Sequence, residues 1–156
     1  MLARLMFALV DFRARKGLAE ASPGAATNDA RQRARRTGIR GETYAYWYLR
    51  RHGYVLVARN YTSPGIKGEI DMVGYDGPML AFVEVKTRAA AEGQPRPEDA
   101  VTAEKRRHIE RVARQFLRAR RADPASCRFD VLAIETRSGV RPAVRLHKGA
   151  FTPDSR

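Results

Sequence analysis

The sequence predicts an α/β domain in which helices cover both faces of a central mixed sheet. The order of the segments is the first reason, because a helix, three strands, a second helix and two more strands follow one another. The second is a nearly continuous apolar run over residues 68–85, which is typical of strands covered on both faces. A length of 156 residues suits one domain with a moderate core.

The apolar run predicts two strands joined by a tight turn. Its sequence over residues 68–86 is GEIDMVGYDGPMLAFVEVK. Residues 68–75 and 79–85 are the expected strands, and Asp76-Gly77-Pro78 joins them, since Asp-Gly between apolar runs is a strong hairpin signal. This hairpin is expected at the centre of the sheet.

Three charged residues fall inside the predicted hairpin. Glu84 and Lys86 are two positions apart and therefore share one face of a strand. The turn pairs Asp71 with either Phe82 or Glu84, and both registers put Asp71 on that same face. Two carboxylates and an ammonium group then converge, which suits Mg²⁺ or Mn²⁺ with a lysine that activates water or offsets charge. The alternative is a buried hairpin with a structural Lys–Glu pair.

The spacing of these residues resembles a nuclease motif. Asp71, twelve intervening residues and then Glu84-Val85-Lys86 resemble the PD-(D/E)xK pattern, with Ile70 where the pattern has Pro. Residues 38–135 resemble the bacterial YraN family, which is similar to archaeal Holliday-junction resolvases. The words that carry this resemblance are Gly41-Glu42, Gly68-Glu69-Ile70-Asp71 and Phe82-Val83-Glu84-Val85-Lys86-Thr87-Arg88. The resemblance implies a restriction-endonuclease-like, three-layer α-β-α fold.

The first confident helix is expected from Thr37 to His52, with Thr37 as its N-cap and Gly53 just past its end. Its apolar stripe is formed by Ala45, Tyr48, Leu49 and His52. Glu42 lies on the same inward stripe and is a candidate third carboxylate, or else a partner for the helix dipole. The resemblance also places an acidic residue at this position.

The segment before the hairpin supplies candidates around the site. Residues 54–60 are predicted as a strand, and a loop from Thr62 to Lys67 is expected at the rim of the site. Lys67 contacts phosphate in this interpretation, or is a solvated loop lysine. Glu69 is two residues before Asp71 and is assigned a supporting role.

A second helix is predicted from Thr102 to Arg121, with an apolar stripe at helical spacing. Lys105 lies on that stripe, so its ammonium group is a candidate to reach the site or a scissile phosphate. The other faces are rich in arginine, which indicates either nucleic-acid contact or a solvated surface.

The end of the chain is predicted to add two strands, at residues 128–135 and 143–146, the last at an edge with Arg141 and Arg145 facing out. Asp130 is expected to be a structural partner for an arginine. Residues 87–99 are expected to form a loop beside the site.

Three parts of the chain are distinguished. Residues 1–37 form an N-terminal extension with a short apolar helix at Met1–Val10 and a linker at Gly17–Asp29, residues 38–151 form the nuclease-like domain, and residues 152–156 form a tail. No apolar run is long enough to span a membrane. One cysteine, Cys127, favours a reducing cytoplasm.

The net charge of +13, with 30 Lys and Arg residues, favours a polyanionic partner, with DNA preferred over an anionic membrane. The residues assigned to nucleic-acid contact are Arg40, Lys67, Arg88, Arg106, Arg107, Arg111 and Arg114. A basic run at Arg31–Arg40 adds phosphate contacts or is a solvated helix start.

The functional hypothesis is a divalent-metal-dependent DNA endonuclease acting on branched or recombination DNA. Asp71, Glu84 and Glu42 would hold Mg²⁺ or Mn²⁺, and Lys86 would assist the water. No small-molecule cofactor is expected, and a homodimer is expected because resolvase-like enzymes cut two strands. The alternatives are a nucleic-acid-binding protein that does not cleave, and a scaffold of a DNA-processing complex.

Overall fold

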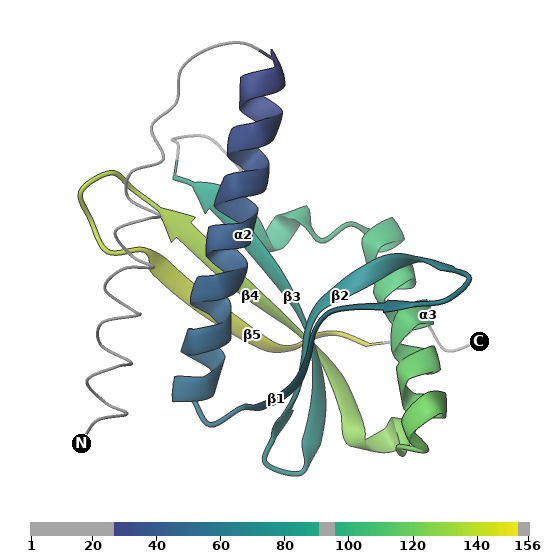
Figure 1. Ribbon diagram of the computed structural model, residues 1–156. Helices are drawn as coiled ribbons and strands as arrows, with labels where there is room; N and C mark the ends of the chain where they lie inside the picture. The colour runs from purple at the N-terminus through teal and green to yellow at the C-terminus, as the bar shows by residue number, and fades with distance from the viewer. Residues whose placement is uncertain (1–26, 91–95, 153–156) are drawn as a thin grey trace.

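The computed structural model describes residues 27–90 and 96–152 and contains a five-stranded sheet with helices on two sides (Figure 1). The predictions for Met1–Val10, for most of the Gly17–Asp29 linker and for the end of the tail lie outside the described residues. The elements are α2 (Thr27–Arg51), β1 (Val55–Ser63), β2 (Ile66–Asp76), β3 (Met79–Ala89), the 3₁₀ turn η1 (Pro97–Ala100), α3 (Ala103–Arg120), the 3₁₀ turn η2 (Pro124–Ser126), β4 (Cys127–Thr136) and β5 (Ala143–Phe151).

The strands follow the order β1-β2-β3-β4-β5 across the sheet. β1, β2 and β3 form an antiparallel meander, β4 lies parallel to β3, and β5 lies antiparallel to β4. A parallel pair needs a crossover connection, which α3 supplies. The mixed sheet confirms the predicted α/β class and is consistent with a restriction-endonuclease-like arrangement.

Each face of the sheet has its own apolar core. Along β3, Leu80 and Phe82 belong to the core under α3, whereas Ala81, Val83 and Val85 belong to the core under α2. This alternation follows from the two-residue period of a strand. It also places Glu84 and Lys86, which share the parity of Phe82, on the α3 side.

The hairpin register is the longer of the two expected ones. Asp76 pairs with Met79, so Gly77-Pro78 forms the turn, and Gly77 has a φ of 58°. The ladder continues to Met72 and Val83. One more step in this register sets Asp71 opposite Glu84.

The start of the first helix was predicted wrongly. α2 begins at Thr27, ten residues before the expected N-cap Thr37. The upstream segment is rich in Ala, Arg and Gln, which have high helix propensity, and it extends the helix through Thr37 and Gly38. The buried stripe also differs, because Tyr44 is buried whereas Tyr48 is half-buried and His52 is exposed.

The expected rim loop between the first two strands is also absent from the described chain. β1 extends to Ser63 and β2 begins at Ile66, so only Pro64 and Gly65 remain as a turn, with Gly65 at a φ of 74°. The β-branched and aromatic residues on both sides favour strand over loop. Two other strands are also longer than predicted. β3 continues through Thr87–Ala89, where a loop was expected, and β5 extends to Phe151 instead of ending at residue 146.

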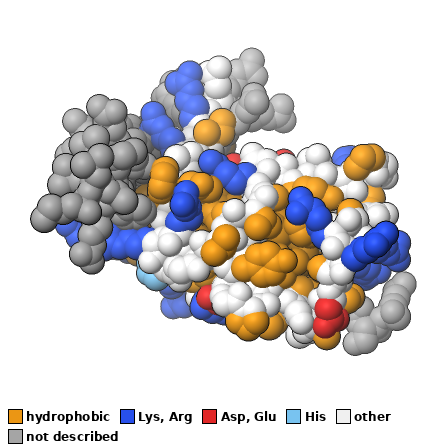
Figure 2. Space-filling model, turned by 60° about the horizontal axis from the view of Figure 1, so that its bottom comes forward, with side chains coloured by type: hydrophobic (Ala, Val, Ile, Leu, Met, Phe, Trp, Pro, Cys, Tyr) orange, Lys and Arg blue, Asp and Glu red, His pale blue; other side chains and the backbone are white. Residues whose placement is uncertain are grey.

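The end of α3 and the turn between β2 and β3 lie at the same end of the molecule (Figure 1). Figure 2 shows that hydrophobic side chains form a broad area at this end, with Lys and Arg at its border. No helix among residues 27–90 and 96–152 is both long enough and apolar enough to cross a membrane.

Candidate active site

Asp71 lies at the point where β2 and β3 separate. The backbone N–H of Val85 donates to Asp71 Oδ2 at 2.7 Å, so the carboxylate takes a donor on β3 just past the last paired residues. Asp71 is 8% exposed. Where the pairing of the two central strands ends, the space between them therefore contains a buried acidic side chain.

Glu84 is the most buried charged group of this space, with 2% of its side chain exposed. Its Oε1 atom is 2.9 Å from Lys86 Nζ and 3.2 Å from Lys105 Nζ. Its Oε2 atom is buried and has no hydrogen-bond partner among the described residues. A buried polar atom without a partner costs free energy, and such an atom in a native structure points to a bound water, an ion or a functional role.

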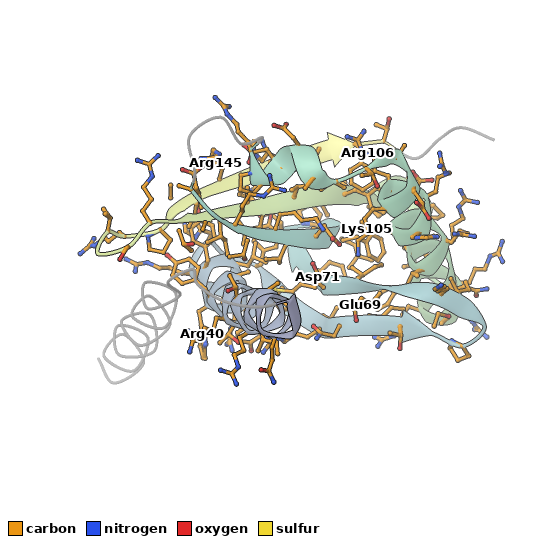
Figure 3. All side chains as sticks on the ribbon, turned by 90° about the horizontal axis from the view of Figure 1, so that it is seen from above. Arg40, Glu69, Asp71, Lys105, Arg106 and Arg145 are labelled. Atoms are coloured by element: carbon orange, nitrogen blue, oxygen red, sulfur yellow. The ribbon has the colours of Figure 1, made fainter. Side chains whose placement is uncertain are left out.

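The electrostatics of Asp71 reflect this crowding of charge. Burial, and secondly the negative charge of Glu84, raise the pKa of Asp71 to about 7, against the lowering effects of the Val85 N–H and of Lys105. The Asp71 and Lys105 side chains point toward one another across the space (Figure 3). Asp71 therefore gains or loses its proton around neutral pH.

Glu42 approaches the same space from α2. It is half-buried, accepts a hydrogen bond from Asn60 Nδ2 at 3.3 Å, and its charge contributes to the raised pKa of Asp71. Gly41 lets the helix come this close, because a Cβ at Gly41 would lie 1.9 Å from Thr87 Oγ1. The hydroxyl of Thr87 is itself buried without a partner.

Asn60 was not predicted as part of the site. It has a φ of 47°, a left-handed conformation that Asn tolerates better than most residues. An Asn near the end of a predicted strand was the available signal. Its contact with Glu42 depends on how α2 packs against β1, which the sequence does not specify.

The structure thus brings together Asp71, Glu84, Lys86 and Lys105, with Glu42 nearby. Glu69 is different, because its side chain is exposed on β2, and Lys67 is exposed on the same strand. Among the described residues, no group of three or more His, Cys, Asp or Glu side chains is arranged to hold a metal ion. The two acidic side chains that lie close enough to affect one another strongly are Asp71 and Glu84.

The residues predicted to contact nucleic acid are spread over the molecule. Arg40 lies on α2 and Arg106 lies on α3, on different sides of the sheet (Figure 3). Arg106 Nε donates to the Val101 carbonyl at 3.2 Å, and its guanidinium lies 5.4 Å from the centre of the Phe151 ring.

The remaining predicted contact residues also differ in their surroundings. Arg114 pairs with Glu110 at 3.6 Å. Arg107 and Arg111 are exposed on α3, and Arg88 is half-buried on β3. Arg40 and Lys67 are exposed as well, so exposure alone does not rank the members of this set.

Two further charged residues have structural roles. Asp130 is fully buried and pairs with Arg128 at 2.9 Å, which confirms the prediction that it is a partner for an arginine. Arg145 was expected to face out, but it forms ion pairs with Glu98 at 2.8 Å and with Glu135 at 3.4 Å. The 3₁₀ turn η1 packs against β3 and β4 and brings Glu98 within reach of Arg145 on β5, a contact that the strand pattern could not predict.

Comparison with known proteins shows what the chain is similar to. Residues 41–134, more than half of the chain, match the Uncharacterised protein family UPF0102. A UPF0102 protein of Koribacter versatilis (strain Ellin345) is 41% identical over 116 residues, which cover 74% of this chain and 79% of that protein. A UPF0102 protein of Symbiobacterium thermophilum is 41% identical over 118 residues, which cover 76% of this chain and 98% of that protein.

The match bears on the site directly. Glu42, Asp71, Glu84, Lys86 and Lys105 all lie inside residues 41–134. The family-level resemblance to YraN proteins is confirmed, whereas the resemblance to nucleases stays a prediction.

Proposed function

The chain belongs to the UPF0102 family, and we propose that it is a divalent-metal-dependent phosphodiesterase that acts on DNA. The observation that supports this most is the buried Glu84 Oε2 atom. It has no hydrogen-bond partner within residues 27–90 and 96–152, although two ammonium groups lie at the other oxygen of the same carboxylate. A carboxylate oxygen left in that state is suited to a cation or to an ordered water.

The donor set fits Mg²⁺ or Mn²⁺. Mg²⁺ commonly uses one or two protein carboxylates and completes its shell with water and substrate phosphate oxygens, and Asp71 and Glu84 provide two such carboxylates. A bound cation would also favour the ionised form of Asp71, whose pKa is raised to about 7 mainly by burial. When bound, the ion would supply Lewis-acid stabilisation of charge at phosphorus and a more acidic water.

The two lysines have separate tasks in this proposal. Lys86 follows Glu84 on the same strand face and is 28% exposed, so its ammonium group can orient the attacking water. Lys105 approaches from α3 and faces Asp71, where it would offset the negative charge of the scissile phosphate. Glu42 and Asn60 would position the nearby backbone or a water, and Glu69 takes a supporting place further along β2.

DNA is the proposed substrate because the chain carries a net charge of +13 and exposed arginines on α3. Branched or recombination DNA is the substrate class that the Holliday-junction resolvase resemblance favours. A homodimer would place two sites on two strands. The cytoplasm is the proposed location, since the single cysteine suits a reducing compartment.

One observation favours a second candidate, a DNA-binding protein or scaffold that does not cleave. Lys86 and Lys105 already neutralise Glu84 at 2.9 and 3.2 Å, so the carboxylate has counter-charges without any cation. In that case no bound cation would favour the ionised form of Asp71, and the cluster would only hold β3 to α3.

The deciding experiment is a cleavage assay on four-way-junction, linear duplex and single-stranded DNA of equal length. Each substrate is incubated with wild-type protein and Mg²⁺, Mn²⁺ or EDTA. The proposal expects cleavage that requires a divalent ion and is lost in Asp71→Asn. Asp76→Asn is a matched control, because Asp76 is on the same strand but pairs with Arg128 and Lys148 away from the site.

Calorimetric titration with Mn²⁺ tests the ion separately from the chemistry. Wild type should bind the ion, Asp71→Asn should not, and Asp76→Asn should behave as wild type. Ion binding without cleavage of any of the three substrates would favour the binding protein, and equal Mn²⁺ binding by wild type and Asp71→Asn would refute the assigned ligands.

A further inference from the structure

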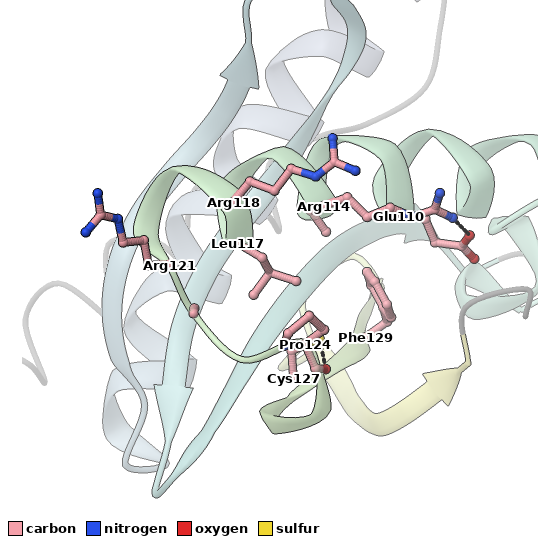
Figure 4. Close-up of a pocket in the computed structure, with 10 residues that line it drawn as sticks. Glu110, Arg114, Leu117, Arg118, Arg121, Pro124, Cys127 and Phe129 are labelled. Carbon is pink, nitrogen blue, oxygen red and sulfur yellow. Dashed lines mark hydrogen bonds and ion pairs between the residues drawn. The ribbon is translucent and has the colours of Figure 1, made fainter. Parts of the chain in front are cut away.

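An apolar pocket lies between the second half of α3 and the η2–β4 junction (Figure 4). Its volume is about 420 Å³, which is within the range of ligand pockets in proteins. Leu117 and Phe129 form part of the floor, with Ala113, Ala122, Pro124 and Cys127 around them. The pocket is therefore large enough and apolar enough to hold one or more hydrophobic side chains.

Arginines line the rim of this pocket. Arg114, Arg118 and Arg121 are among the lining residues, and the Arg118 and Arg121 side chains extend outward from the helix (Figure 4). The three arginines are spaced four and three residues apart, so they extend over about 10 Å along the helix at 1.5 Å per residue. Arg114 pairs with Glu110, whereas no carboxylate among the described residues forms an ion pair with Arg118 or Arg121. The rim can therefore accept negative charge from a partner.

The pocket floor does not suit a nucleobase. Bases bind single-strand-binding proteins by stacking on open aromatic faces. Phe129 is the aromatic residue of the floor, and its ring is stacked on Phe82 at 5.5 Å and on Phe151 at 4.9 Å. It is 3% exposed, so neither face is available.

The length of the arginine row favours a peptide over a simple amphiphile as the ligand. A fatty acid has one carboxylate and can satisfy one guanidinium group. An extended peptide advances about 3.3 Å per residue, so a run of three or four acidic residues matches the roughly 10 Å row of arginines. The chain itself has a net charge of +13, which disfavours a second copy as the occupant.

We propose that this pocket docks a short acidic peptide segment of another protein, with a Leu or Phe side chain in the apolar floor and its acidic residues on Arg118 and Arg121. This surface is distinct from the candidate active site. Leu117 is twelve residues after Lys105 on the same helix, a separation of about 18 Å. A partner could therefore be held while the site at Glu84 remains open.

The binding test uses a fluorescein-labelled probe peptide of four Asp residues followed by Leu, Leu and Phe. Fluorescence anisotropy should show saturable binding to the full chain that weakens as salt rises. Arg118→Glu should weaken it about tenfold, since an exposed charge is reversed next to the acidic residues. Arg141→Glu is the matched control, because it makes the same charge change at an exposed residue between β4 and β5.

A second variant tests the floor. Ala122→Phe adds a ring to a half-buried position in the pocket and should also weaken binding about tenfold. Its melting temperature is measured alongside. A probe in which the three apolar residues are Ser should bind at least tenfold more weakly than the original, whereas equal binding of the two probes would overturn the apolar contact.

Cys127 reports occupancy of the pocket, because it is the single cysteine of the chain and lines the floor. The probe peptide should slow alkylation of Cys127 by iodoacetamide, measured by intact mass. An oligothymidine that protects Cys127 when the peptide does not would overturn the proposal in favour of a nucleic-acid surface. Peptide binding that is unchanged in both Arg118→Glu and Ala122→Phe would overturn it as well.

Discussion

Two buried carboxylates of the central strands have opposite surroundings. Asp130 on β4 is fully buried, and both of its oxygens accept hydrogen bonds: Oδ1 from Arg128 and the Gly149 N–H, and Oδ2 from the Tyr54 hydroxyl, each at 2.9 Å. Glu84 on β3 is 2% exposed, but its Oε2 atom has no partner. Both side chains are removed from water, but they differ in whether each carboxylate oxygen accepts a hydrogen bond.

The difference distinguishes a structural acid from a candidate functional one. Removing one partner of a buried, fully hydrogen-bonded charge is costly. Arg128, the partner of Asp130, also pairs with Asp76, which in turn pairs with Lys148. Near Glu84 lies a second acid, Asp71, whose pKa is raised first by burial and secondly by the charge of Glu84. Groups with shifted pKa values cluster at functional sites. The comparison therefore favours a functional role for Glu84 and a structural role for Asp130.

The largest expected effect is on stability. Asp130→Asn should lower the free energy of unfolding by about 3 kcal/mol or more, because it leaves Arg128 without its buried partner. Glu84→Gln should cost less than about 1 kcal/mol, since Lys86 and Lys105 are 28% exposed and can be hydrated and the repulsion of Asp71 is removed. Urea unfolding of both variants checks this, and equal losses would erase the distinction.

Catalysis should show the reverse order. Lys86→Ala should lower the single-turnover cleavage rate by roughly 10²-fold, the scale of losing one preorganised electrostatic group. Its stability should fall by less than the roughly 3–5 kcal/mol of an unpaired buried charge, because Lys105 remains at 3.2 Å from Glu84. Lys148→Ala, which removes a lysine from the Asp130 side, should cleave at the wild-type rate. A folded Lys86→Ala protein with wild-type cleavage would remove Lys86 from the reaction.

The pH dependence of stability should have opposite signs in the two regions. The pKa of Asp71 is raised from 3.8 to about 7, mainly by burial, so its contribution to stability is complete below pH 3.8 and is lost as pH rises toward 7. The slope for one proton is at most about 1.4 kcal/mol per pH unit. Asp71→Asn should abolish that loss, and Mn²⁺ should raise the melting temperature of wild type more at pH 8 than at pH 5.

Asp76 is the control for that measurement. Lys148, and next Arg128, hold the pKa of Asp76 below its usual range. Its contribution is therefore present above the unfolded pKa of 3.8 and lost as pH falls further. Asp76→Asn should flatten the acid limb of the stability curve and leave the limb between pH 4 and 7 unchanged, so identical curves for the two variants would contradict the assignment.

The smallest expected effect concerns salt. Arg111→Ala should reduce the slope of log binding constant against log salt concentration by about 0.9, the value for one phosphate contact on duplex DNA. Arg141→Ala should leave the slope unchanged. Fluorescence anisotropy with a duplex at four or more salt concentrations checks both, and equal slopes for wild type and Arg111→Ala would indicate that DNA binds to another surface.

Much of the fold could be predicted from local pattern. The two-residue period put Glu84 and Lys86 on one face, and helical spacing put Lys105 on the buried stripe of its helix, as the contacts of both lysines with Glu84 now confirm. Thr102 was a recognisable start, and its hydroxyl indeed accepts from the Lys105 N–H at 3.2 Å. These features depend on residues close in sequence, where geometry is fixed by the backbone period.

The sequence alone therefore determined the α/β class, the hairpin, and the shared face of the acidic and basic residues. Tertiary structure decided that β2 and β3 separate at Asp71, that Asn60 reaches Glu42, and that one oxygen of Glu84 lacks a partner. Periodicity specifies which side of a strand a residue faces, but not which elements meet there or whether donors complete the set. Those outcomes depend on packing between segments far apart in the chain, such as Gly41 of α2 against Thr87 of β3, and no local spacing encodes that contact.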